Sequence, residues 1–281
     1  MAGELITQDF QIEWNGQLLG DDTSGLEIIS FTPFAYPDVR TSDQNRPLDH
    51  GLFAGVDYYG SRTITLQMEV WGGWTAVRRV LAAFQIGVEA PLAWQLPDVG
   101  QLRANARVRR RDPLIVDQLY VVGATTTVSV EFLCTDPRLY GETKTSTATL
   151  SGSGGGMTFD ATFNLIFGAS TTPATLNIDN AGTFETRPVI RIDGPITNPS
   201  LGNETTGYTL SFNGELAAGE YLDVDFLNRT VVLNGTASRY VWIVDSAAWW
   251  SCPPGANTIR LGGSPGSPAP TMTVTWADAY V

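Results

Sequence analysis

The sequence predicts a mainly β protein with two domains: a barrel-like first domain with one helix, and an antiparallel sandwich or jelly roll. Three observations support this prediction. Short runs of alternating polar and apolar residues recur along the chain, 29 glycines and 16 prolines supply turns between them, and only one stretch has helical periodicity. A length of 281 residues also suits two domains of ordinary size.

The N-terminal segment predicts a hairpin, one further strand and a long loop. In FQIEWNGQLLG (10–20), two short runs are joined by Asn15-Gly16, a dipeptide favoured in two-residue type I′ turns. The run LEIISF (26–31) predicts the next strand. Residues 33–60 are rich in Pro, Asp and Gly and have no sustained period, so we expect a long excursion that serves function or an interface.

The rest of the first half predicts more strands around a single helix. Residues 61–71 alternate cleanly and predict a strand. Residues 75–86 predict the helix, because four apolar residues repeat at helical spacing and form one stripe. Those residues are Val77, Val80, Leu81 and Phe84. Residues 91–97 lie between prolines and predict an edge strand. Further strands are expected at 119–124 and 125–141.

The domain boundary is predicted from composition. Residues 141–156 are almost wholly Gly, Ser and Thr, which is typical of a flexible linker or of edge strands joined by a glycine-rich turn. We therefore expect domains at 1–142 and 143–281. The second shows no helical periodicity, and its predicted strands are 157–167, 174–179, 187–193, 207–212, 220–226, 230–235, 240–244, 257–261 and 271–276.

One short stretch, LRANARVRRRDP (102–113), concentrates positive charge in an otherwise acidic chain. Read as a strand with period two, it places four arginines on one face and Arg110 on the other. The four are Arg103, Arg107, Arg109 and Arg111. Like charges on one face need acidic partners, and a neighbouring copy or an adjoining protein supplies them. We therefore predict a protein interface here.

Overall charge argues against nucleic acid as a bound ligand. The net charge is −12, from 17 basic and 29 acidic residues, whereas affinity for duplex nucleic acid comes largely from neutralising phosphates. No N-terminal secretion signal and no apolar stretch of membrane-spanning length is recognisable. We expect a protein that folds in a cytoplasm without membrane insertion.

The sequence offers no recognisable catalytic, cofactor or metal-binding set. The single histidine, His50, lies in a loop and is expected to be structural rather than a general base. Asp223 and Asp225 share a strand face, which suits the polar side of an amphipathic strand better than a carboxylate pair or half of a calcium site. Cys134 and Cys252 lie far apart in apolar segments, and we expect both to be buried free thiols.

Aromatic residues gather in the second half. Tyr240, Trp242, Trp249, Trp250 and Trp276 fall there, and an exposed ring commonly stacks on a sugar. Tryptophan also fills cores and interfaces. Trp249 and Trp250 are therefore candidates for contact with a sugar or a protein partner.

Several segments, taken together and in order, carry a family resemblance. In the first half they are the hairpin, Arg40…Arg46…DHG (49–51), SRTITLQMEVWG (61–72), the helix at 75–86 and TVSVEFLCTDPRLYG (127–141). In the second half they are NAGTFETRPVIRIDGPITNP (180–199), GELAAGEYLDVDFLNRTVVLNG (214–235) and WW…PPGANTIRL (249–261). This order resembles the distal tail protein (Dit) family of bacteriophages with long non-contractile tails, the siphovirus-type tail components.

The resemblance implies a RIFT-like β-barrel at 1–142 and a galectin-like β-sandwich at 143–281. It implies a structural, non-enzymatic part of the virion tail tip or baseplate, assembled in the host cytoplasm. Six N-terminal domains would form a ring between the tail tube protein and the tail-tip hub protein, with the arginine face as a subunit or tube interface. The C-terminal domains would carry receptor-binding or fibre proteins. DNA would be passing cargo that an acidic channel does not retain.

Two other classes of function remain open from the sequence. A carbohydrate-binding adhesion protein would use the C-terminal sandwich, although some family members insert a sugar-binding module and this chain has no insertion of that size. A glycoside hydrolase would need two carboxylates facing each other across a cleft, and no pair stands out. A six-fold ring would favour the structural role, whereas a strict monomer that binds glycans would favour adhesion.

Overall fold

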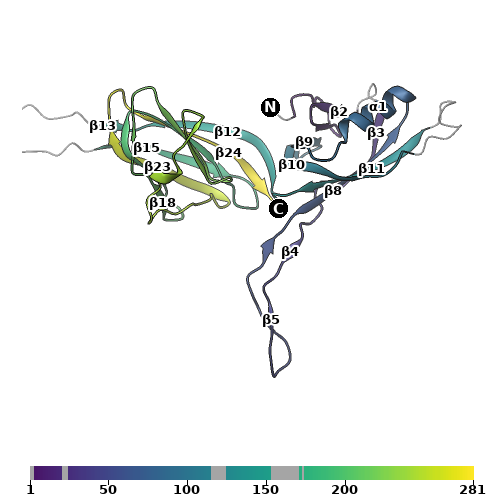
Figure 1. Ribbon diagram of the computed structural model, residues 1–281, viewed down its shortest axis with the longest axis horizontal. Coiled ribbons are helices and arrows are strands. Elements are labelled where there is room, and N and C mark those ends of the chain that lie inside the picture. The colour runs from purple at the N-terminus through teal and green to yellow at the C-terminus, as the bar shows by residue number, and fades with distance from the viewer. Residues whose placement is uncertain (1–2, 21–24, 115–124, 153–170, 173) are drawn as a thin grey trace, which may run out of the picture. The chain divides into compact units, whose positions relative to one another are not determined.

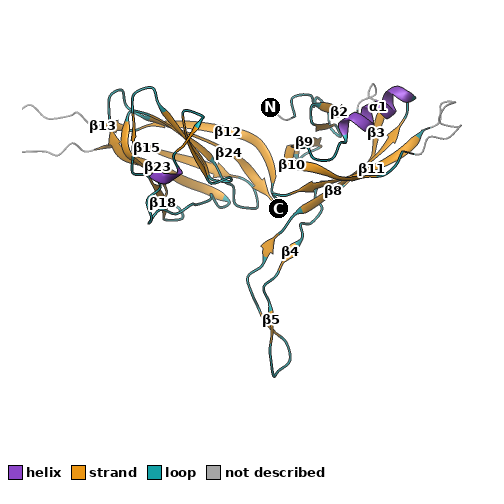
Figure 2. Ribbon diagram, in the orientation of Figure 1, coloured by secondary structure: helices purple, strands orange, loops and turns teal. Residues whose placement is uncertain are grey.

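The computed structural model describes residues 3–20, 25–114, 125–152, 171–172 and 174–281. Contacts divide the chain into two compact units, residues 1–141 with Val281 and residues 142–280. Strands dominate both units, and the described residues contain one α-helix and one short 3-10 helix (Figures 1 and 2). The predicted fold class, mainly β with a barrel and a sandwich, is confirmed.

The first unit is a curled antiparallel sheet. Its central strand is β10 (Gly100–Arg111), which pairs with β9 over its first part and with β11 over its last. One run of neighbours is β2–β1–β9–β10 and the other is β10–β11–β8–β3. The sheet curls so that the outer strands of the two runs, β2 and β3, come together. The Gly20 N–H, directly after β2, donates to Leu26 O of β3 at 3.2 Å. The other strands are β1 (Ile12–Trp14), β2 (Gln17–Leu19), β3 (Leu26–Phe31), β8 (Arg62–Val70), β9 (Glu89–Leu96) and β11 (Thr126–Cys134).

The core of this unit is built around aromatic rings. Trp14 and Phe132 meet edge to face at 4.8 Å, and both are buried. The helix α1 (Trp74–Ala83) packs its end against them, because Trp14 Nε1 donates to Ala83 O at 2.9 Å and Phe84 meets Phe132 at 6.1 Å. The helix is confirmed, but Leu81 is 41% exposed and is not part of its buried face. The buried residues are Ala76, Val77, Val80, Ala83 and Phe84.

Two further predictions concern the edges of this sheet. The predicted hairpin forms, with Asn15 and Gly16 both at positive φ as a type I′ turn requires. The prediction that 91–97 is an edge strand is wrong, because β9 has β1 on one side and β10 on the other. The proline at 91 is tolerated because pairing with β1 begins only at Leu92.

A long hairpin, residues 35–60, leaves the barrel between β3 and β8; we call it the arm. It corresponds to the predicted excursion and extends well away from the rest of the first unit (Figure 1). Two short pairs of strands hold it as a ribbon. These are β4 (Val39–Arg40) with β7 (Tyr58–Tyr59), and β5 (Gln44–Asn45) with β6 (Leu52–Phe53).

The second unit is a sandwich of two antiparallel sheets. One sheet has the order β12–β24–β16–β20–β21–β22, and the other has β15–β23–β17–β18 with β19 beside β17. The first sheet contains β12 (Leu139–Thr149), β16 (Val189–Asp193), β20 (Tyr221–Asp225), β21 (Thr230–Leu233), β22 (Ala237–Ser238) and β24 (Thr271–Tyr280). The second contains β15 (Ala174–Asn180), β17 (Ile196–Asn203), β18 (Tyr208–Ser211), β19 (Glu215–Leu216) and β23 (Gly255–Pro265). A separate pair joins β13 (Ser151–Gly152) to β14 (Thr171–Thr172).

Most predicted strands of this unit are present, but one predicted run is not a strand and several strands were not predicted. The run 240–244 is not a strand: Tyr240–Trp242 form the 3-10 helix η1, and Val241 is 87% exposed. The strand β17 was not predicted, because its sequence contains Pro199 and Gly202. The predicted strands at 119–124 and 157–167 lie outside the described residues.

Candidate functional site

The arm presents apolar side chains that no part of the described chain covers. Every residue from Asp38 to Tyr58 is exposed. Leu48 at the tip is 100% exposed and Phe53 is 57% exposed. Exposed apolar surface on this scale marks an interaction site. The other large apolar residues of this exposed stretch are Val39, Leu52, Val56 and Tyr58.

The arm nevertheless has a defined conformation. Ser42 Oγ donates to Val56 O at 3.0 Å and accepts from Val56 N–H at 2.9 Å, across the ribbon. Asp43 accepts from Gly55 N–H at 2.7 Å. The Arg46 guanidinium lies 5.2 Å from the centre of the Phe53 ring. Local contacts therefore hold the ribbon together without burying it.

Arg62 anchors the base of the arm. Arg62 is 2% exposed, and its guanidinium donates to Ala35 O at 2.7 Å and to Pro137 O at 2.9 Å, which ties the arm to the segment that follows β11. Burial lowers the pKa of Arg62. Tyr36 and Tyr59 meet beside it, and the hydrogen bond between their hydroxyls raises the pKa of Tyr36. We did not identify Arg62 from the sequence, although it stands in phase with the buried residues of β8.

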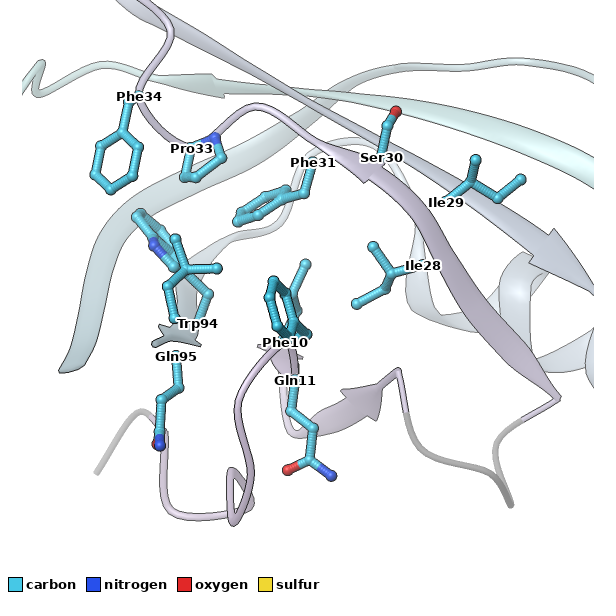
Figure 3. A pocket seen from close by; sticks show the side chains of 12 residues that line it. Phe10, Gln11, Ile28, Ile29, Ser30, Phe31, Pro33, Phe34, Trp94 and Gln95 are labelled. Atoms are coloured by element: carbon cyan, nitrogen blue, oxygen red, sulfur yellow. The ribbon is translucent and has the colours of Figure 1, made fainter. Parts of the chain in front are cut away.

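An apolar groove of about 390 Å³ lies between β3 and the strands β1 and β9 (Figure 3). The exposed rings of Phe10 and Phe34 stand at this groove, with Phe31 and Trp94 between them. Trp94 is fully buried, and its indole N–H has no acceptor among the described residues. Buried polar groups are normally hydrogen-bonded. Because the rings of Phe10 and Phe34 are exposed at its rim, the groove is a second apolar surface that a partner can cover.

The arginine stretch forms β10, but a bulge changes which faces its side chains occupy. Arg107 lies opposite Leu133, yet Arg110 lies opposite Glu131, so the register shifts by one between Val108 and Arg110. Arg109 is the extra residue, and a bulge turns two neighbouring side chains to one side. Arg110 is thus on the outer face, and the prediction that Arg111 shares it is wrong, because Arg111 lies opposite the buried Val130.

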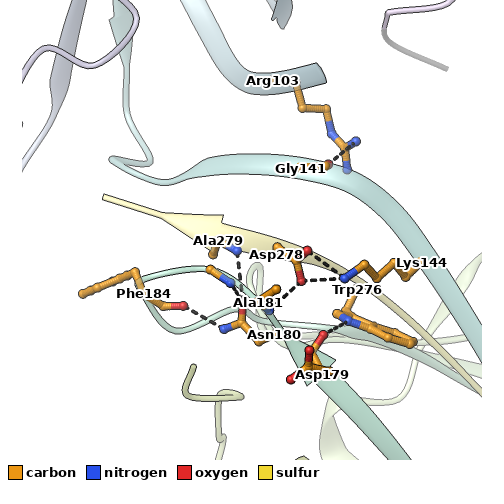
Figure 4. Close-up of polar contacts among 11 residues, drawn as sticks. Arg103, Gly141, Lys144, Asp179, Asn180, Ala181, Phe184, Trp276, Asp278 and Ala279 are labelled. Atoms are coloured by element: carbon orange, nitrogen blue, oxygen red, sulfur yellow. Dashed lines mark hydrogen bonds and ion pairs between the residues drawn. The ribbon is translucent and has the colours of Figure 1, made fainter. Parts of the chain in front are cut away.

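Intramolecular contacts satisfy some of these arginines. Arg103 is half-buried and donates to Gly141 O at 3.0 Å (Figure 4), and burial lowers its pKa. Arg110 pairs with Asp112 at 3.2 Å. Arg107 and Arg109 are exposed and form no ion pair or hydrogen bond with another described residue. On the outer face of β10, the charge that still needs a partner is therefore concentrated at these two positions.

The second unit contains a pocket of about 240 Å³ that Trp249 and Trp250 line. Trp250 is 4% exposed, contacts the Phe226 ring in a tilted arrangement with 4.1 Å between centroids, and donates its indole N–H to Leu201 O at 3.0 Å. Trp249 is half-buried at the pocket wall. The two candidates therefore differ: one is part of the core and the other borders the pocket.

The remaining polar candidates have structural partners. Asp223 forms a two-point ion pair with Arg191 at 2.7 and 2.9 Å, and Asp225 accepts from two backbone N–H groups in the following turn. His50 is exposed in the arm loop. Cys134 and Cys252 are buried free thiols, and burial raises the pKa of each to about 12.

Lys144 and Asp278 pair at 2.7 Å within the second unit, where Asp278 also accepts from Ala181 N–H (Figure 4). These contacts hold the end of β15 against β24, so the charges of Lys144 and Asp278 stabilise the fold. Among the described residues, no group of three or more His, Cys, Asp or Glu is placed to hold a metal ion. No helix in the described part of the chain is long and apolar enough to cross a membrane.

Comparisons with known proteins agree with the resemblance seen in the sequence. Residues 181–280 match the family model of the siphovirus-type tail component, C-terminal domain. The fold is similar to the crystal structure of the Dit protein of phage SPP1, described as a paradigm of the hub adsorption apparatus in phages that infect Gram-positive bacteria. The TM-score is 0.65 at 14% identity, over 98% of this chain and 100% of that one.

A chain of the phage P2 baseplate, in its activated conformation with Ca, is also similar. Its TM-score is 0.50 at 10% identity, over 94% of this chain and 97% of that one. A search of curated proteins found no match. At these identities the likeness to solved structures establishes the fold, and the match to the family model covers residues 181–280.

Proposed function

We propose that this chain, which belongs to the siphovirus-type tail component family through its C-terminal domain, forms a six-membered ring in the phage tail tip. The family gives it a structural role in the tail or baseplate of the virion. In our proposal the first unit forms the ring between the tail tube protein and the tail-tip hub protein. The second unit is peripheral and carries receptor-binding or fibre proteins, and DNA passes through the ring without being bound.

The observation that carries the proposal is the exposed arm. A ribbon that holds its shape through local hydrogen bonds, yet exposes Leu48, Leu52 and Phe53, gains stability only by packing on another surface. Burying a Leu or Phe side chain contributes about 1.5–3 kcal/mol. The same unit exposes an apolar groove at Phe10 and Phe34.

We assign the groove of one copy to the arm of the next. The arm and the groove are different surfaces, so the contact between copies is heterologous, that is, head to tail. Heterologous contacts between identical chains produce a closed ring when the rotation from each copy to the next leads back to the first copy.

Native mass spectrometry and electron microscopy of the full chain test the ring. The unmodified protein should give six-fold rings. The double variant Leu52→Asp, Phe53→Asp on the arm, and the single variant Ile29→Asp at the groove, should each give monomers with an unchanged thermal transition. Val241→Asp is the matched control, because Val241 is an exposed apolar residue of the second unit. A ring that survives the arm variant would contradict the proposal.

The arginine face is assigned to docking on a neighbouring copy or on the tail tube protein. Arg107 and Arg109 carry it, whereas Arg103 is anchored to Gly141 and Arg111 lies on the other face. Replacing Arg107 and Arg109 by Glu should abolish assembly into the ring or onto the tube while the monomer stays folded. The control Arg78→Glu, Arg260→Glu makes the same change of charge at exposed arginines elsewhere. Assembly that is unaffected by the first pair, or equally lost with the second, would remove this assignment.

A further inference from the structure

Four loops of the second unit converge on the pocket that Trp249 borders. The pocket is lined from the segment before β16, the turn between β17 and β18, the turn between β20 and β21, and the segment before β23. Its lining residues are Glu185, Arg187, Thr206, Tyr208, Phe226, Arg229, Trp249, Trp250 and Ser251. We propose that this pocket binds one saccharide residue that carries a negatively charged group.

The size and the aromatic lining fit a single sugar ring. At about 240 Å³ the pocket is smaller than the range of about 300–1,000 Å³ found for drug-sized ligands. Trp250 and Phe226 form the floor, since both are buried and their rings lie in contact, with 4.1 Å between centroids. Tyr208 is 57% exposed and Trp249 is half-buried, so aromatic surface remains available to the C–H face of a ligand.

The charge of the lining fits an anion. Glu185 is neutralised in place, because it accepts from Ser251 Oγ at 2.6 Å and from Arg187 Nη2 at 3.3 Å. Arg229 is exposed and forms no ion pair with another described residue. The pocket therefore has one uncompensated guanidinium in a chain of net charge −12. A guanidinium binds carboxylate or phosphate through two parallel hydrogen bonds.

The loop that carries Arg229 is held in place before any ligand arrives. Asp225 accepts from the backbone N–H groups of Leu227 and Asn228 at 2.8 and 2.9 Å, and from Asn228 Nδ2 at 2.7 Å. Arg229 itself has φ of 53°, a left-handed conformation that a non-glycine residue adopts at some cost. The backbone at Arg229 is thus fixed at the edge of the pocket, which lowers the ordering cost of binding.

Titration of the full-length protein with matched sugars tests the proposal. Methyl glucuronide should bind at least about tenfold more tightly than methyl glucoside, which has the same ring without the charge. Glucose 6-phosphate distinguishes the two sources of charge: tighter binding than the glucuronide identifies phosphate as the natural group, and weaker binding identifies carboxylate. Equal affinity for glucuronide and glucoside, or no binding of either charged sugar at millimolar concentration, would overturn the proposal.

Variants assign the effect to the pocket. Arg229→Gln should remove the preference for the charged sugar with an unchanged thermal transition. Trp249→Leu should weaken binding of charged and neutral sugars alike, and its thermal transition should stay cooperative but move to lower temperature, because Trp249 also packs against Phe226. Arg260→Gln, at an exposed arginine of the same unit outside the pocket, should change nothing. A glutamate-containing tripeptide that binds more tightly than the glucuronide would show that the pocket recognises a protein partner instead.

This inference is independent of the ring. The preference for the charged sugar should persist in the arm variant Leu52→Asp, Phe53→Asp, because all lining residues belong to one unit of one chain. Loss of the ring with retained binding would leave this proposal intact.

Discussion

The arm of the first unit and the sandwich of the second place their apolar residues in opposite environments. Every residue from Asp38 to Tyr58 on the arm is exposed, including Leu48 and Phe53. In the sandwich, strands of both sheets turn their apolar side chains into a single buried cluster that includes Ile190, Leu261 and Trp250. One region has its hydrophobic partners within the chain, and the other lacks them.

The difference shows how these two regions obtain stability. Burial within the chain stabilises the sandwich whether or not another molecule is present. The arm gains nothing from its apolar residues until a partner covers them, so these residues contribute to association rather than to folding. A substitution that affects folding in one region should therefore affect assembly in the other.

The largest effect is expected from Trp250→Ala. The side chain is 4% exposed and contacts the Phe226 ring, and removing a buried Trp costs about 3–5 kcal/mol. Calorimetry should show the transition of the second unit move to lower temperature while that of the first unit stays in place. The control Leu48→Ala, at a residue that is 100% exposed, should leave both transitions unchanged and weaken assembly. If Leu48→Ala lowers thermal stability as Trp250→Ala does, the contrast between the regions is wrong.

An intermediate effect is expected where the arm joins the barrel. Arg62→Leu leaves the carbonyls of Ala35 and Pro137 without their donors, and a buried unsatisfied group costs about 1–3 kcal/mol. Denaturant unfolding should show a loss of that order in the first unit, and the ring yield should fall because the base of the arm is no longer fixed. Arg62→Lys should show a similar loss, because a single ammonium group cannot donate to both carbonyls as the planar guanidinium does. Full ring yield from both variants would show that the arm needs no anchor.

Alternation predicted the strands well where one face of a strand is buried. β8 buries every second residue from Arg62 to Val70, as the alternation of 61–71 predicts. The same rule failed at Arg109, because a bulge adds one residue and no local signal in a row of arginines marks it. It failed again at Tyr240–Trp242, where an apolar run forms a 3-10 helix.

The candidate surfaces were less predictable for a physical reason. The composition of 33–60 predicted a long excursion, but it did not show that the segment is a ribbon anchored by Arg62. Arg62 reaches Ala35 and Pro137, which are 27 and 75 residues away in the sequence. The pocket likewise depends on four loops that meet only after folding. Trp249 was a candidate from its residue type, whereas Arg229 had no sequence signal beyond its charge.

The smallest effect is expected from an exposed charge pair that is complete within one unit. Arg191 and Asp223 form two hydrogen bonds, and the guanidinium lies 4.1 Å from the centre of the Tyr221 ring. Their side chains are 46% and 28% exposed, and pairs of this kind contribute about 0.2–1 kcal/mol. Arg191→Ala should therefore shift denaturant unfolding of the second unit slightly, less so at high salt, and leave the ring unchanged. Arg107 and Arg109 have no such partner within the described chain, so their substitution should act on assembly and not on unfolding. A loss of assembly in Arg191→Ala would mean that a satisfied arginine also serves an interface, and charge pairing within the chain would then be no guide to where partners dock.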